Sequence, residues 1–277
     1  MTVRFQPRRH GPYAGVVSPD LIAAYADATA DDTHAVRSGA AVPVVFPIVL
    51  AFHAGDDARA DLPARIWERV RGGVHGEHDV VVHPPLRPGD RIDTWTSISA
   101  VRTVRPGTQV VVHFEHIAPD GVVAVEQWWT MILLGLDGMA DLGELPAAHP
   151  FPPAALAHPL GTAVQQVPSD TARRYAAVSG DWSAHHFDIA VARAEGFDVL
   201  FNHGLCTMAM CVHRLLRIAG IDDPARVRRV AVRFASPTPL GGDVEVRAYR
   251  ADPDVLVFEA SCGDQTVVTN GRLELRP

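Results

Sequence analysis

The segment LCTMAMCVHRLLRI, from Leu205 to Ile218, is apolar on nearly all sides of a helix, with basic residues only towards its end. A helix that is hydrophobic all round must be enclosed by other elements. We therefore predict a buried central helix here. The segments after it alternate apolar and polar residues, as antiparallel strands do, and turn signals separate them. These expected strands are Arg229–Phe234, Asp243–Tyr249, Val255–Cys262 and Thr266–Leu275.

The chain contains a diverged tandem repeat. Tyr25–Asp31 resembles Tyr175–Asp181 at an offset of 150 residues, and His83–Asp90 resembles Ser236–Asp243 at an offset of 153. We predict two α+β halves, residues 1–137 and 161–277, joined by a linker over 138–160 that is rich in Pro, Gly and Ala. The matching strands of the first half are expected over Asp79–His83, Asp90–Val101, Gln109–Ala118 and Val122–Leu134.

The stretch YAAVSGDWSAHHFD, from Tyr175 to Asp188, places a carboxylate and an imidazole five positions apart, at Asp181 and His186. The residues between them follow no helical or strand period, so we predict a structured loop. A loop that carries both an acid and a base is a common place for chemistry. The first half keeps Asp31, but the position equivalent to His186 is Val36, and His34 is two residues out of register. Only the second half is expected to be catalytic.

This stretch resembles the type 2, (R)-specific enoyl-CoA hydratases of the MaoC-like hotdog superfamily, whose motif is roughly Y-x-x-x-S-G-D-x-N-P-[LI]-H-x-D. Two later blocks resemble the family in the same order: Ala194–Phe197 with His203–Thr207, and Val232–Pro237 ending at Gly242-Asp243. The positions that match the motif are Tyr175, Ser179, Gly180, Asp181, His186 and Asp188. The resemblance covers most of Ala157 to Pro277.

The resemblance implies a double hotdog, in which each half is an antiparallel sheet around one long helix and the halves pair through their sheets. It also implies reversible hydration of a 2-enoyl thioester, with Asp181 and His186 acting on one water. The backbone N–H of Gly204, at the start of the buried helix, would bind the thioester oxygen. We expect no cofactor. A 3-hydroxyacyl-carrier-protein dehydratase and a low-activity acyl-thioester binding subunit remain alternatives.

Three residues depart from the family motif: Ser183 and Ala184 replace Asn and Pro, and His185 replaces an aliphatic residue. Ser and Ala are smaller, so we predict a wider pocket and a bulkier acyl group than a short linear one. Trp182, Ser183, His185 and His203 are expected to line the substrate, although packing and local turn bonds explain such residues equally well.

The first half is expected to donate an acyl tunnel, because Val42–Phe52 (VPVVFPIVLAF) is apolar enough to line one. His75–His78 (HGEH) is expected to be structural or substrate-lining. Arg229 and Arg233 are candidates for the CoA phosphates, but arginines on a half-solvated strand edge are an equally good interpretation.

Composition excludes several classes of function. The net charge of −7 provides no basic excess for nucleic acid. All 25 basic residues are Arg, so no lysine Schiff base is possible. His185, His186 and His203 lack the spacing of a zinc site, and we expect no metal. The odd cysteine count predicts reduced thiols, and no leader or membrane segment is evident. We expect a cytoplasmic homodimer that binds acyl-CoA or acyl-carrier-protein thioesters.

Overall fold

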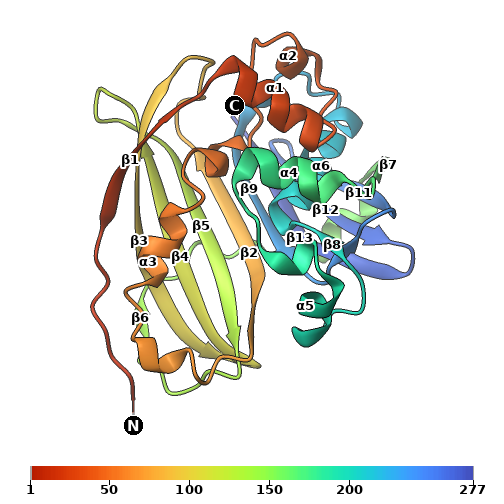
Figure 1. The fold of residues 1–277 in the computed structure, drawn as a ribbon. Helices are drawn as coiled ribbons and strands as arrows, with labels where there is room; N and C mark the ends of the chain where they lie inside the picture. The colour runs from red at the N-terminus through yellow and green to blue at the C-terminus, as the bar shows by residue number, and fades with distance from the viewer. Residues whose placement is uncertain (1, 277) are drawn as a thin grey trace.

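One continuous antiparallel sheet runs through both halves of the chain in the computed structural model, which describes residues 2–276 (Figure 1). The strand order is β1-β3-β4-β5-β2 in the first half and β9-β13-β12-β11-β7 in the second, so the halves mirror each other about the β2–β9 junction. The first-half strands are β1 His10–Val16, β2 Gly72–Val82, β3 Arg91–Val104, β4 Gly107–Ile117 and β5 Val123–Leu134. The second-half strands are β7 Pro159–Gln166, β9 Val227–Phe234, β11 Asp243–Asp252, β12 Val255–Cys262 and β13 Gln265–Leu275. The predicted repeat and its strands are confirmed, and the two sheets pair edge to edge.

The predicted central helix of the second half is confirmed as α6, Gly204–Ile218. It packs on β7, β9 and β11 of its own sheet, and its apolar side chains are buried on nearly every side. The other helices are α1 Pro19–Ala28, α2 His34–Arg37, α3 Ala54–Arg59, α4 Thr171–Ser179 and α5 Ile189–Ala194. Short 3₁₀ turns are η1 Phe46–Leu50, η2 Ala64–Ile66, η3 Pro153–Ala157, η4 Ala184–His186 and η5 Pro224–Arg226.

The two repeat copies meet through α1 and α4. Ser18 caps α1 by accepting a hydrogen bond from the N–H of Leu21, and Pro19 fits the first helical position because its missing N–H is not needed there. Tyr25 on α1 and Tyr175 on α4 are both fully buried, with ring centroids 6.1 Å apart. The residues that revealed the repeat therefore form one core contact between the halves.

The first half differs from the expected pattern, because it has no long central helix. The corresponding region contains only η1 and the six-residue α3, which packs on β3 and β4 (Figure 1). Pro47 lies in the first turn of η1, where proline is tolerated, and Pro63 lies four residues after the end of α3. A Cβ at Gly55 would lie 2.9 Å from the Trp129 ring, so glycine allows α3 to lie directly on the sheet.

The junction between the halves corrects one prediction about arginine. Arg229 on β9 donates to both carboxylate oxygens of Asp79 on β2, at 2.6–3.1 Å, and it also pairs with Glu274. The Arg229 and Asp79 side chains are only 12% and 6% exposed. Arg229 is thus a structural contact between the halves and has no free guanidinium for a CoA phosphate. Arg233, which pairs with Glu77, is more than half exposed.

The connection between the halves is shorter than predicted. The short strand β6, Leu142–Gly143, pairs with β3, and β7 begins at Pro159, two residues inside the expected linker. Two further short strands, β8 Phe201–Asn202 and β10 Thr238–Pro239, pair with each other beside the start of α6. All three cysteines are free. Within residues 2–276, no helix is both long and apolar enough to cross a membrane.

Candidate active site

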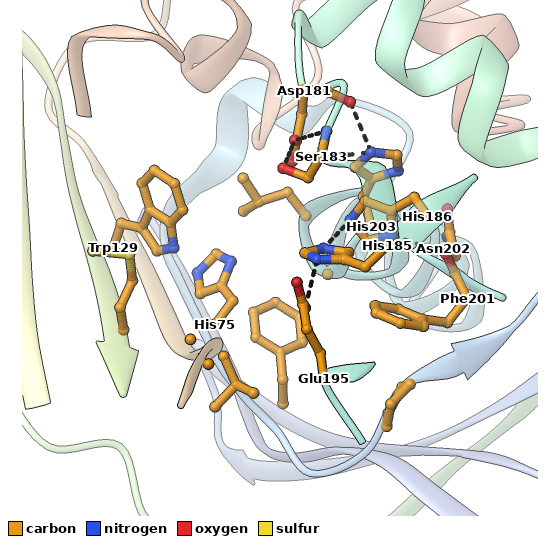
Figure 2. Close-up of a pocket in the computed structure, with 18 of the residues that line it drawn as sticks. His75, Trp129, Asp181, Ser183, His185, His186, Glu195, Phe201, Asn202 and His203 are labelled. Carbon is orange, nitrogen blue, oxygen red and sulfur yellow. Dashed lines mark hydrogen bonds and ion pairs between the residues drawn. The ribbon is translucent and has the colours of Figure 1, made fainter. Parts of the chain in front are cut away.

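A cavity of about 880 Å³ lies where the two halves meet, and the residues of the predicted catalytic loop line it. The second half contributes the loop after α4, the start of α6 and Phe234 at the end of β9. The first half contributes α3 and the facing strands β2 and β5, including His75 and Trp129 (Figure 2). The cavity is therefore built by both repeat copies, although the acid/base residues come from one.

Asp181 is placed by a sharp turn at the end of α4. Gly180 ends the helix with φ +79°, a left-handed conformation that favours glycine. A Cβ at Gly180 would also lie 2.8 Å from the His53 ring of the first half. Oδ1 of Asp181 accepts hydrogen bonds from the Ser183 N–H at 3.1 Å and the Ser183 hydroxyl at 2.6 Å. Ser183 therefore orients the carboxylate.

His186 lies in η4, directly beside Asp181 in space, and its side chain is buried. Its Nδ1–H donates to the carbonyl of Phe201 at 2.9 Å, because a carbonyl can only accept. Nε2 is thus the nitrogen that remains for chemistry. Burial, with the neighbouring His203 and His185, lowers the pKa of His186 to about 2, so the ring has a strong preference for the neutral form.

His203 lies closer to this pair than the sequence indicated. It is the N-cap residue of α6, and its Nε2–H donates to the backbone carbonyl of Asp181 at 3.0 Å. Its ring centroid lies 3.7 Å from that of His186 (Figure 2). His203 thus fixes the catalytic loop to the start of α6. The family-like His203–Thr207 block was the available signal, but it gave no indication of this contact.

The ligand atoms of Asp181, His186 and His203 all lie within 4.8 Å of one another, a spacing that a metal ion could bridge. His203 Nε2 carries the hydrogen that it donates to the Asp181 carbonyl, so only Nδ1 of that ring has a lone pair for a metal. The spacing also fits one water held between the carboxylate and the His186 ring, and the absence of a metal stays a prediction.

The start of α6 faces the cavity at Gly204. The first N–H groups of a helix have no partner inside the helix and carry its partial positive charge. A Cβ at Gly204 would lie 3.3 Å from the Phe234 ring, so glycine leaves this N–H approachable. These features suit the predicted role in binding a thioester oxygen, which stays a prediction.

His185 and Trp182 both line the cavity, but in different ways. His185 is held between the Phe201 ring, on which it stacks, and Glu195, whose Oε2 lies 2.9 Å from Nδ1. Its Nε2 lies 3.1 Å from Nε2 of His186 (Figure 2). Trp182 is 57% exposed, and its ring packs against Phe187 in the same loop.

The expected acyl-lining segment of the first half contributes little to the large cavity. In Val42–Phe52, only Phe52 lines it, whereas Val42, Val44 and Pro47 line a separate cavity of about 220 Å³. Asp31 of the first half lies beside an imidazole of the second half, because His213 on α6 places Nδ1 3.5 Å from its Oδ1. Both side chains are buried, and the space beside them is only about 10 Å³. His75, by contrast, lines the main cavity as expected.

Residues 153–271 match the family described as MaoC like domain. The peroxisomal multifunctional enzyme type 2 of Drosophila melanogaster is 26% identical over 178 residues, which are 64% of this chain and 30% of that protein. The chain spans about a third of the length of this relative. The 3-hydroxyacyl-thioester dehydratase X of Mycobacterium tuberculosis is 27% identical over 227 residues, which are 81% of this chain and 74% of that protein.

Two solved structures show the fold. A MaoC-like dehydratase from Phytophthora capsici superposes with a TM-score of 0.81 at 20% identity, covering 98% of this chain and 96% of that one. A Mycobacterium tuberculosis protein described as having a double hotdog fold superposes with a TM-score of 0.61 at 14% identity, covering 99% and 96%. The α+β double hotdog expected from the repeat is confirmed.

Proposed function

Because residues 153–271 form a MaoC-like dehydratase domain, we propose that the protein reversibly hydrates trans-2-enoyl thioesters to (R)-3-hydroxyacyl thioesters. One observation carries the proposal: the Asp181 carboxylate and the neutral His186 ring lie within 4.8 Å of each other on the wall of a large cavity. That separation suits two groups that bind one water and exchange protons with it.

Hydration needs three contributions from the protein. One group takes a proton from the water as its oxygen attacks C3, and another gives a proton to C2; Asp181 and His186 supply these two roles. A dipole must also stabilise the negative charge that develops on the thioester oxygen. The N–H of Gly204 at the start of α6 supplies it. Dehydration follows the same steps in reverse.

The substrate that we propose is bulkier than a short linear enoyl group, and its carrier is CoA or acyl carrier protein. The cavity of about 880 Å³ is near the upper end of the range for small-molecule sites, roughly 300–1,000 Å³. Ser183 lines the cavity beside Asp181 and takes less space than Asn, and Ala184 next to it takes less space than Pro. The short α3 of the first half supports the same conclusion, because Arg59 at its end and Trp129 and Met131 on β5 line the cavity.

The test is the loss of the enoyl ultraviolet absorbance when the protein is added to crotonyl-CoA, longer linear enoyl-CoAs and branched or cyclic ones. Comparing these rates with the rates for the same acyl groups on acyl carrier protein shows which carrier the protein uses. The control is the Asp181→Asn, His186→Ala double variant, which removes both proton-transfer groups. The proposal fails if no thioester in the panel loses absorbance faster with wild-type protein than with the double variant.

A further inference from the structure

Three side chains that line the cavity, His186, His185 and Glu195, form one chain of contacts. His186 Nε2 lies 3.1 Å from His185 Nε2, and His185 Nδ1 lies 2.9 Å from the Glu195 carboxylate (Figure 2). At its other end, His186 Nδ1 lies 2.9 Å from the Phe201 carbonyl. The chain therefore has three contacts at hydrogen-bond distance, and each needs one hydrogen.

Counting those hydrogens gives an unexpected result. The Phe201 carbonyl can only accept, so His186 Nδ1 carries a hydrogen. An ionised Glu195 can also only accept, so His185 Nδ1 carries a second one. If both rings were neutral, two nitrogen lone pairs would then face each other across the 3.1 Å contact. A third hydrogen must lie between them, so the group of Glu195, His185 and His186 holds one proton more than two neutral rings and is uncharged overall.

We propose that His185 and Glu195 form a proton store that supplies His186. The proposal rests on the hydratase function above and deepens it by dividing the roles. Asp181 takes one proton from the water, whose oxygen bonds to C3. The stored proton moves onto Nε2 of His186, the contact with His185 opens, and Nε2 then gives that proton to C2 as the new C–H bond forms. The proton on Asp181 then returns to the store, so the enzyme is regenerated and one water has been added. His185 and Glu195 act through His186, so both are positioning residues.

The surroundings favour a proton that resides mainly on His185. Burial gives His186 a pKa of about 2, so it acts as acceptor in the contact between the two rings. His185 has the Glu195 carboxylate to balance a positive charge. The other titratable groups around the cavity are Tyr175, Asp181 and His203 in the second half, and His53, Asp56, Arg59 and His75 in the first. Asp181 is the acid among them that shares the water with His186.

The first test counts protons without any substrate. Nitrogen NMR of histidine-labelled protein at pH 7 should show His185 with both ring nitrogens protonated. In Glu195→Gln the amide can donate to Nδ1, so all three contacts persist with a neutral His185, and the extra proton should be lost. Glu126→Gln is the matched control, because Glu126 bridges His83 and His113 outside the cavity. A wild-type His185 with one protonated nitrogen, or a Glu195→Gln protein identical to wild type, overturns the proposal.

The second test is the pH dependence of turnover. In Glu195→Gln, kcat should fall about tenfold at pH 8 with KM unchanged, and should recover towards pH 6 as solvent supplies the missing proton. A pH profile that matches wild type overturns the store. If wild-type protein turns over no thioester, the hydratase function fails, while the NMR proton count still decides whether the store exists.

Discussion

Asp181→Asn and His186→Ala should each lower kcat by about a hundredfold, which corresponds to about 2.7 kcal/mol of transition-state stabilisation. If the two groups acted independently, the double variant would lose about 5.4 kcal/mol. Because their atoms lie within 4.8 Å and act on one water, removal of either should disable most of the shared step. We therefore expect the double variant to lose little more than either single variant, with a coupling energy of about 2–3 kcal/mol. Initial rates from the enoyl absorbance measure all four proteins.

The unfolding temperatures of the two single variants are expected to differ, and measuring them shows whether a loss of turnover comes from a loss of folding. The amide oxygen introduced by Asp181→Asn can still accept from Ser183, so the unfolding temperature of this variant should be unchanged. His186→Ala leaves the buried Phe201 carbonyl without its donor, which costs about 1–3 kcal/mol. Near wild-type turnover in either folded variant would refute the assignment, and additive losses would show that the two groups do not share one water.

Three further predictions concern the loop, the junction and the buried imidazoles. Ser183→Asn with Ala184→Pro should raise turnover of short linear enoyl-CoA and lower that of bulky thioesters, because the pocket narrows; an unchanged substrate ranking would contradict this. Arg229→Ala should lower the free energy of unfolding by about 3 kcal/mol in denaturant titrations, because it leaves the buried Asp79 carboxylate unpaired; a loss below ~1 kcal/mol would contradict it. Burial lowers the pKa of His116 to about 3, so its contribution to stability is complete above pH 6.5 and is lost as the pH falls towards 3. Between pH 6.5 and 5 the free energy of unfolding should fall by roughly 2 kcal/mol because of His116 alone. The His116→Asn variant should lack this part of the decrease in the same denaturant titrations. An equal decrease in both proteins would contradict the prediction.

The sequence predicted those features that a local pattern controls. Alternation of apolar and polar residues located the strands, and the all-round apolar segment located α6, because both patterns reflect burial on a fixed geometry. Asp181 and His186 were identified because they lie five positions apart within a segment that resembles the family motif. The structure brings them together because Gly180 turns the chain back towards the start of α6.

The contacts that the sequence did not predict join segments that no periodicity relates. Arg229 was a candidate for phosphate binding, and only the pairing of β9 with β2 shows that Asp79 neutralises it. His185 in η4 is held by Glu195, which lies ten positions later at the end of α5. The first half has no long helix, and the expectation of symmetry between the copies did not allow for that difference.

The small space beside Asp31 leads us to expect one substrate site in each chain. His213 from the other half approaches this carboxylate, and about 10 Å³ remains, which is room for a single water at most. Titration calorimetry should therefore find one thioester per chain, although the chain contains two copies of the fold. When a duplicated domain loses one of its two equivalent sites, the residues of the copy without a site can change without affecting the reaction. Here the first copy supplies walls for the cavity of the second, so the shape of the cavity can change on α3, β2 and β5 without altering the residues that we propose to move protons.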